Sequence, residues 1–210
     1  MAMIRRFSKT QRAAHWLVAA AFGIMLLSGG EVPHHWTWTT PWFDVHVGAA
    51  AVLITGLVGL LVGANGPALR ATASELRRLD PLDRAWLSPS RALTRQPPPP
   101  VGRFNAGQKL NARLSLLGIL ALYATGIYLI TIGNTALGHL HGPFAFLTSV
   151  LIAGHIFMAL LNPSTRHALP GMTLGTVDRR WAKHHFPRWV EEKDADGTID
   201  TASADVRGSR

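Results

Sequence analysis

Cysteine is absent from the 210 residues of this chain. A disulfide framework, a cysteine-ligated iron–sulfur cluster and covalent attachment of a c-type haem are therefore excluded. Any redox cofactor must be held non-covalently, and the ten histidines are the main ligands available for that purpose.

Acidic residues are also scarce, with 12 Asp and Glu against 21 Lys and Arg and a net charge of +9. The basic residues flank long apolar runs, so lipid headgroups and membrane topology explain the charge better than nucleic acid does. The apolar runs lack paired acidic residues and clear inverted repeats, which argues against a transporter. No small-residue cleavage signal follows the first run, so we expect that run to remain in the mature protein.

Four apolar runs each approach the roughly 20 residues that a membrane-spanning helix needs. They cover residues 13–30, 46–63, 110–132 and 139–161. These runs predict an all-α integral membrane protein, a four-transmembrane-helix bundle formed within residues 1–190. The polar, acidic segment 191–210 is predicted to be a disordered tail.

The distribution of Lys and Arg predicts the orientation of the helices. Basic residues precede the first run, fill the connection 64–109 and follow the fourth run, whereas the connections 31–45 and 133–138 contain none. By the positive-inside rule, both termini are expected in the cytoplasm of a bacterium, with the protein in its cytoplasmic (inner) membrane. An aromatic belt is then expected at the outer face, formed by Trp36, Trp38, Trp42 and Phe43.

The long connection between the second and third runs is not uniform. Residues 68–79 have Leu and Ala at helical spacing with Arg on the other side, which predicts a helix on the membrane surface. Pro81, Pro89 and the run 97–100 interrupt it, so the rest is predicted to be a proline-rich, partly extended cytoplasmic connection.

Four histidines occupy positions suited to haem ligation. His15 begins the first run at its cytoplasmic end, and His46 begins the second at its external end. His141 and His155 lie fourteen residues apart on the fourth run, nearly on one face and about 21 Å apart along the axis. Histidines at like heights are expected to pair, His15 with His155 and His46 with His141.

A single histidine near a helix end often only hydrogen-bonds at the membrane interface, but four at matched heights favour a function within the membrane. We interpret them as axial ligands of two haem b groups, which would form an electron path across the bilayer. The other histidines are interpreted as solvated or interfacial: His34, His35, His139, His167, His184 and His185.

The segment GRFNAGQK, residues 102–109, precedes the third run. Asn105 and Gln108 carry amide groups that could bind a quinone carbonyl, and Gly107 permits close approach. The same residues also suit a helix N-terminus with Asn105 as the cap, and the local pattern alone favours the cap.

Four segments of the chain resemble the cytochrome b (gamma) subunit of membrane-bound formate dehydrogenases: RFSKTQRAAHW around His15, GRFNAGQKLN, HIFMAL from His155, and GMTLGTVDRRWAKHHFPRW. The resemblance implies two haem b groups with the pairing given above. It also implies a quinone site near Asn105, Gly107 and Gln108, on the side of the cytoplasmic haem. The implied partners are an iron–sulfur beta subunit, a molybdenum or tungsten alpha subunit that oxidises formate, and the membrane quinone pool.

Two alternatives remain open at this point. The chain could be the cytochrome b of another membrane dehydrogenase, such as a hydrogenase, or a membrane anchor without haem. No residues suited to formate chemistry itself are present, so this chain is expected to transfer electrons within an oxidoreductase complex.

Overall fold

The computed structural model describes residues 2–31, 41–63, 66–94, 97–133 and 135–196. Four helical segments in it are long and apolar enough to cross a membrane: Lys9–Gly30, Pro41–Val62, Ala106–Thr131 and Gly138–Leu161. The predicted all-α membrane architecture is thus confirmed.

The chain divides into two compact units. The bundle unit comprises residues 9–71 and 114–153, and the mixed unit comprises residues 1–8, 72–113 and 154–210 as far as these are described. Three helices cross from one unit's residues to the other's: α3 (Gly66–Arg77), α6 (Ala106–Thr131) and α7 (His141–Ile156).

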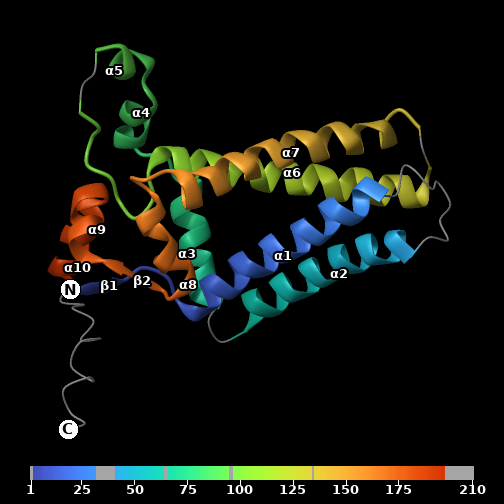
Figure 1. Cartoon of the computed structure of the whole chain (residues 1–210), viewed down its shortest axis with the longest axis horizontal. Helices are drawn as coiled ribbons and strands as arrows, with labels where there is room; N and C mark the ends of the chain where they lie inside the picture. The colour runs from blue at the N-terminus through green and yellow to red at the C-terminus, as the bar shows by residue number, and fades with distance from the viewer. Residues whose placement is uncertain (1, 32–40, 64–65, 95–96, 134, 197–210) are drawn as a thin grey trace, which may run out of the picture. The chain divides into compact units, whose positions relative to one another are not determined.

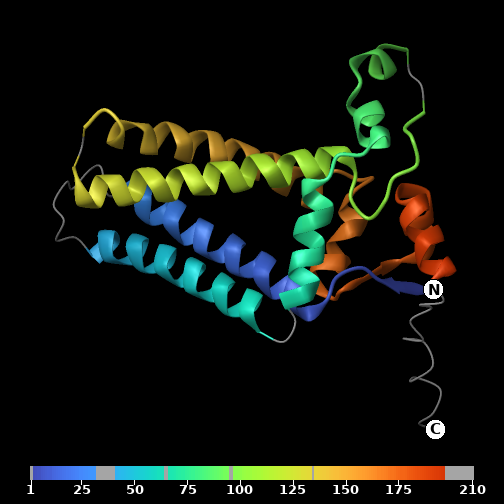
Figure 2. The same ribbon diagram turned by 180° about the vertical axis from the view of Figure 1, so that it is seen from behind.

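The bundle unit is built from four long helices. Helix α1 (Lys9–Glu31) packs along α2 (Pro41–Val62), and α6 lies beside α7, as both ribbon views show (Figures 1 and 2). The 3₁₀ turn η2 (Gly138–Leu140) leads into α7, and a π-helical turn, η3 (Phe157–Leu161), ends the fourth span.

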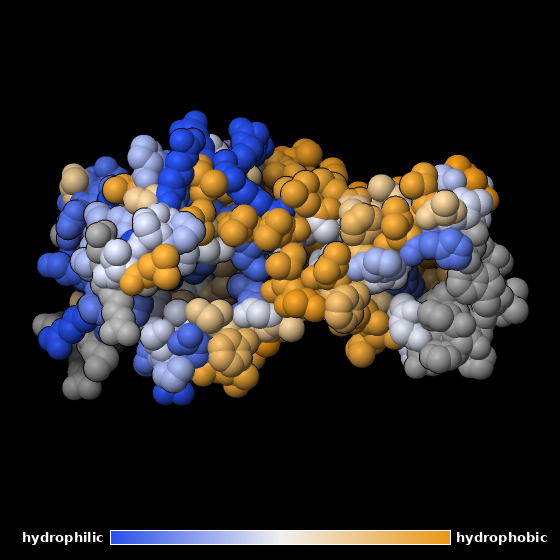
Figure 3. Space-filling model, turned by 90° about the horizontal axis from the view of Figure 1, so that it is seen from above, coloured by the Kyte–Doolittle hydropathy of each residue, from blue (hydrophilic) through white to orange (hydrophobic). Residues whose placement is uncertain are grey.

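The bundle unit exposes apolar side chains and buries several polar ones. Leu27 is 77% exposed, whereas the hydroxyl-bearing Ser28 and Thr148 are 1% and 2% exposed. On the face drawn in Figure 3, hydrophobic residues predominate over much of the surface, with hydrophilic patches between them. A helix that is apolar on its outer face requires a lipid surrounding, because water would penalise that surface.

Close contacts hold these helices together. A Cβ added at Gly118 of α6 would lie 2.4 Å from the hydroxyl oxygen of Thr148 on α7, so only glycine allows this approach. Tyr123 of α6 donates a 2.6 Å hydrogen bond to the carbonyl oxygen of Ala50 on α2. Close packing at small residues and hydrogen bonds between helices both favour helix association in lipid.

The mixed unit contains most of the short elements among the described residues. Besides the shared helices it includes η3, α4 (Pro81–Leu87), α5 (Pro89–Thr94), η4 (Arg166–Ala168), α8 (Leu169–Thr173), α9 (Arg179–His185) and α10 (Pro187–Ala195). Strand β1 (Met3–Arg5) pairs antiparallel with β2 (Thr176–Asp178), with Ile4 opposite Val177. The sequence analysis did not predict this short two-stranded sheet, which accompanies the all-α membrane architecture.

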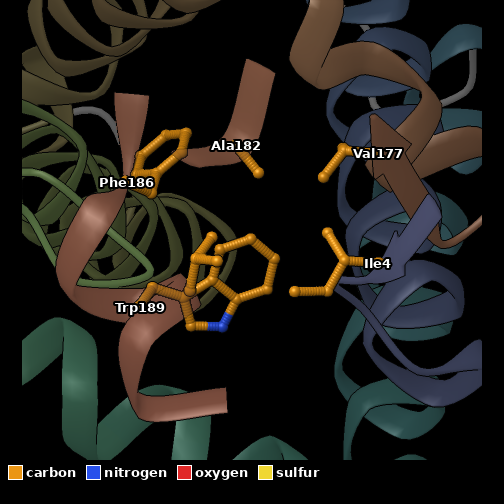
Figure 4. Close-up of a cluster of buried hydrophobic side chains, with 6 residues drawn as sticks. Ile4, Val177, Ala182, Phe186 and Trp189 are labelled. Atoms are coloured by element: carbon orange, nitrogen blue, oxygen red, sulfur yellow. The ribbon is translucent and has the colours of Figure 1, made fainter. Parts of the chain in front are cut away.

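A small apolar core lies between this sheet and the last two helices. Its buried members are Ile4, Val177, Ala182, Phe186, Trp189 and Val190. Figure 4 shows Ile4 and Val177 directed from the sheet toward Ala182 of α9, Trp189 of α10 and Phe186 between these helices. The motif WAKHHFPRW therefore folds into the core of the mixed unit.

Arg6 is buried beside that core, at 4% exposure. Its guanidinium lies 4.0 Å from the ring centre of Phe186, with Phe7, Trp181 and Trp189 within 6.0 Å. Burial, and after it the charge of Arg103, lowers the pKa of Arg6 to about 9, so the group is still protonated at pH 7. Cation–π contacts compensate the charge.

The prolines of the connection begin helices instead of only ending them. Pro81 and Pro89 are the first residues of α4 and α5, a position that needs no backbone N–H. Asp80 and Asp83 cap α4 reciprocally, each side chain accepting from the other's backbone N–H at 2.8 and 3.0 Å. Residues 97–100 are without helix or strand, as predicted.

A buried ion pair joins α4 to α6. Lys109 Nζ lies 2.6 Å from Asp83 Oδ2, and the two side chains are 8% and 5% exposed. The same carboxylate oxygen accepts from the backbone of Asp80, so the buried charge is paired and hydrogen-bonded.

Two predictions concern segments that the structure describes only in part. Helix α10 includes residues 191–195, which the sequence assigned to the disordered tail, while 197–210 lie outside the described residues. Trp36 and Trp38 of the predicted aromatic belt, with His34 and His35, also lie outside them, whereas Trp42 and Phe43 fall in the first turn of α2.

Candidate haem-ligand site

Two of the four predicted ligands face one another within the bundle unit. His46 lies in the second turn of α2 and His141 is the first residue of α7. Their ring centres are 6.2 Å apart and their ring planes are inclined at 68°. The predicted pair of His46 and His141 is thus brought together although 95 residues separate them in sequence.

The Nδ1 atom of each imidazole is engaged by a hydroxyl on the preceding helix. Ser28 Oγ of α1 lies 3.1 Å from Nδ1 of His46, and Thr125 Oγ1 of α6 lies 2.9 Å from Nδ1 of His141. Each ring is held through its Nδ1 atom, which leaves Nε2 as the nitrogen for a metal.

The separation of the two rings would accommodate a haem iron held by His46 and His141. Imidazole nitrogens bind transition metals at about 2.0–2.1 Å, so two ligand nitrogens on opposite sides are about 4 Å apart. Each ring centre lies a further ring radius away, which agrees with the observed 6.2 Å. A bare ion would need three or more protein ligands, and no such group exists among the described residues.

The second predicted pair consists of His15 and His155, which lie on α1 and α7. His15 lies in the second turn of α1, where its ring meets Trp16 edge-on at 5.4 Å, and His155 lies in the last turn of α7. Helix α7 is continuous from His141 to His155, so the expected rise of about 21 Å along it is retained. The pairing of His15 with His155 stays a prediction.

Asn105 and Gln108 form the N-terminal cap of α6. The backbone N–H of Gln108 donates to Asn105 Oδ1 at 2.8 Å, and the backbone N–H of Asn105 donates to Gln108 Oε1 at 3.0 Å. Gly107 lies against Trp86, whose ring carbon would be 3.2 Å from an added Cβ. The cap that the local pattern favours is present.

Sequence reasoning missed Ser28, Thr125 and Tyr123. Each is a polar residue inside an apolar run, and Ser28 and Thr125 are both followed by glycine. A hydroxyl within a span is common, however, because it can bond to its own helix backbone. Only the three-dimensional arrangement separates these from Thr55 and Thr131, whose hydroxyls donate to carbonyl oxygens of their own helices.

The other histidines described have different surroundings. His185 stacks on Trp181 with ring centres 4.6 Å apart, and its Nδ1 lies 3.0 Å from the Trp181 carbonyl oxygen. His139 lies in the 3₁₀ turn before α7.

Four membrane-spanning helices that enclose opposed imidazoles define the class of membrane cytochromes b. The chain belongs to the prokaryotic cytochrome b561 family, whose model matches residues 6–175. Membership of a cytochrome b family implies the binding of haem b and a role in membrane electron transfer.

Curated relatives of the chain are cytochrome subunits. The cytochrome b556 subunit of the nitrate-inducible formate dehydrogenase of Escherichia coli is 31% identical over 103 residues, which are 44% of this chain and 45% of that protein. The formate dehydrogenase cytochrome b556 subunit of Haemophilus influenzae is 32% identical over 102 residues, 44% of this chain and 41% of that protein. The chain thus matches less than half the length of these relatives.

Proposed function

We propose that this chain is the di-haem membrane cytochrome b subunit of a formate dehydrogenase complex in a bacterial cytoplasmic membrane. His46 and His141 would hold one haem b, and His15 and His155 the other. The observation that carries the proposal is the opposed pair His46 and His141, 6.2 Å apart and each engaged at Nδ1.

A haem b held by His46 and His141 would supply one-electron transfer, the chemistry of an iron with two histidine ligands. The protein's part is to fix the two rings and to exclude water from them. Apolar helices around the pair serve the second purpose, because their outer faces are covered by lipid.

The position of the two sites along α7 supports transfer across the membrane. His141 and His155 begin and end one helix, about 21 Å apart. With both termini in the cytoplasm, as the charge distribution predicts, His46 and His141 lie at the external side. An iron–sulfur beta subunit, itself served by a molybdenum or tungsten alpha subunit, is expected to deliver electrons on that side.

The quinone is proposed to bind at Asn105, Gly107 and Gln108. In the capping arrangement both amide oxygens accept from backbone N–H groups, which fixes the orientation of the amides. The NH₂ groups then point away from these bonds as donors, and a quinone carbonyl is an acceptor. Capping and quinone binding are therefore compatible roles of the same two side chains.

The electron donor is tested on the intact complex, solubilised gently from membranes of the source cell through an affinity tag on this chain. Reduction of a soluble quinone is followed with formate, and separately with hydrogen, as the donor. We expect reduction with formate, absent when the tagged chain carries His141→Ala. Reduction with hydrogen and none with formate would assign the chain to a hydrogenase and overturn the formate dehydrogenase part of the proposal.

A further inference from the structure

The surroundings of His46 and His141 repeat one arrangement twice. In the hairpin of α1 and α2, Ser28 holds the ring of His46, and in that of α6 and α7, Thr125 holds the ring of His141. The residue after each hydroxyl is glycine, Gly29 in one case and Gly126 in the other. The hydroxyl and the histidine are 18 residues apart in the first hairpin and 16 in the second.

We propose that Ser28 and Thr125 are positioning residues that fix the tautomer, the orientation and the electron-donating strength of the two axial imidazoles. This inference rests on the proposed function, in which His46 and His141 are ligands of one haem. Each hydroxyl–glycine pair, Ser28–Gly29 or Thr125–Gly126, is called an imidazole seat.

The direction of the hydrogen bonds follows from the other contact of each hydroxyl. Ser28 Oγ lies 2.7 Å from the carbonyl oxygen of Ile24, and Thr125 Oγ1 lies 2.7 Å from that of Ala121. A carbonyl oxygen can only accept, and a hydroxyl has one hydrogen to donate. The hydroxyl proton is therefore used on the helix carbonyl, and the oxygen accepts from Nδ1–H of the histidine.

A protonated Nδ1 has one chemical consequence. Neutral imidazole carries one proton, so each ring is the tautomer with a free lone pair on Nε2. Both rings are thus set to offer Nε2 to a metal. The hydroxyls are 1% exposed at Ser28 and 9% exposed at Thr125, so water does not compete with these bonds.

The glycines let the rings approach the helices that carry the hydroxyls. A Cβ added at Gly29 would lie 3.1 Å from Cε1 of His46, and one added at Gly126 would lie 3.3 Å from Cε1 of His141. Both separations are tighter than ordinary van der Waals contact, so a larger residue would displace the ring. Hydroxyl and glycine together constrain the position of the imidazole ring.

The seats would also act, through the imidazole ring, on a haem iron held by His46 and His141. A hydroxyl oxygen that accepts a hydrogen bond from Nδ1–H increases the basicity of Nε2, the nitrogen proposed to bind the iron. A more basic ligand stabilises the oxidised, more positive iron. Loss of either hydroxyl is therefore expected to raise the midpoint potential of the haem between His46 and His141. Because both seats act on one haem, the shifts should occur on the same haem and should add in the double variant.

The test compares Ser28→Ala and Thr125→Val with matched controls in the full-length, haem-loaded chain. Ser149 and Thr131 bond to their own helix carbonyls at 2.7 and 2.8 Å, so Ser149→Ala and Thr131→Val remove equivalent hydroxyls away from the ligands. The measurements are haem content per chain, the midpoint potentials by spectroelectrochemistry, and the EPR signal of the ferric haem.

We expect one midpoint potential to shift upward in each seat variant and neither potential to shift in either control. Ser28→Thr and Thr125→Ser keep a hydroxyl, so their potentials should match those of the wild type. Loss of one haem in a seat variant, restored in its hydroxyl-retaining counterpart, also supports the inference. Seat variants whose potentials and EPR signals match those of the controls would overturn it while leaving the proposed function intact. A wild-type chain that binds no haem would overturn both.

Discussion

The interiors of the two units differ in what they bury. In the bundle unit the deeply buried side chains include the hydroxyls of Ser28 and Thr148, whereas large apolar residues such as Leu27 face outward. In the mixed unit Val177, Trp189 and their neighbours form an apolar core. The difference reflects the solvent: lipid accepts apolar surface and penalises unpaired polar groups, while water does the reverse.

The comparison extends to how each unit treats its buried polar groups. The mixed unit compensates full charges, pairing Lys109 with Asp83 and surrounding Arg6 with aromatic rings. The bundle unit buries hydroxyl groups instead, at Ser28, Thr125 and Thr148, and keeps the imidazoles of His46 and His141 partly buried. Neutral groups suit a membrane interior that has to hold a redox group without adding charge.

The largest expected effect comes from removing a proposed haem ligand in the bundle unit. His141→Ala should reduce haem b from two to one per chain and abolish quinone reduction by the complex, because the proposed site then has a single imidazole. Haem is quantified as the pyridine haemochrome. The control is His139→Ala, which alters a nearby histidine in η2 and should retain both haems. Equal haem content in the two variants would contradict the ligand assignment.

The second prediction tests the difference in burial between the two units, polar side chains inside the bundle unit and apolar ones inside the mixed unit. Trp189→Ala should destabilise the mixed unit by about 3–5 kcal/mol, because it leaves a cavity in a water-surrounded core. Leu147→Ala, at a residue of α7 that is 57% exposed, should cost far less, since lipid fills the space. Thermal unfolding of both variants in lipid nanodiscs provides the measurement. Similar losses in the two would mean that the outward apolar face of α7 is buried against protein.

The extent to which sequence predicts such an architecture depends on the range of the interactions. The spans were predicted to within about five residues, because each is a long local run of apolar residues. The sheet was missed, since β1 and β2 are three residues each and more than 170 residues apart. Helices α4 and α5 were missed because Pro81 and Pro89 were interpreted as interruptions, although proline also begins helices.

The candidate site divides in the same way. The histidines could be predicted, since an ionisable residue in an apolar run is rare and their spacing is simple. Ser28 and Thr125 could not, because a hydroxyl in a membrane helix usually bonds to its own backbone. Their role depends on a contact between two helices, which no local pattern reveals.

A third, smaller effect separates the two roles of Asn105. Asn105→Asp keeps the capping oxygen but lacks the NH₂ donor, so stability should be nearly unchanged while quinone reduction slows. One lost hydrogen bond of about 0.5–1.5 kcal/mol corresponds to roughly a two- to tenfold loss in affinity or rate. Steady-state kinetics with varied quinone concentration measure it. Asn105→Asp kinetics equal to wild type, with both haems present, would remove Asn105 from the quinone site.

The smallest expected effect is a pH dependence in the mixed unit. Burial acts to raise the pKa of Asp80, but the backbone N–H of Asp83 and then Arg188, 3.0 Å away, outweigh it and lower that pKa. A carboxyl with a lowered folded pKa stabilises the protein above its unfolded pKa of about 3.9 and loses this contribution as the pH falls further.

Asp80→Asn keeps the cap and removes the charge, so it should cost about 0.2–1 kcal/mol at pH 7, as partly exposed ion pairs do. The difference from wild type should shrink as the pH falls from 4 through the lowered folded value. Chemical unfolding at a series of pH values measures it. A difference that does not depend on pH would show that the ion pair with Arg188 does not stabilise the unit.

The central claim is that two pairs of imidazoles hold two haem b groups in this chain. The most direct measurement is a dithionite-reduced minus oxidised spectrum of the purified full-length protein, with pyridine haemochrome quantified per chain. Two b-type haems per chain are predicted. A folded, helical sample with no Soret band would contradict the account, and a single haem per chain would restrict it to the pair His46 and His141.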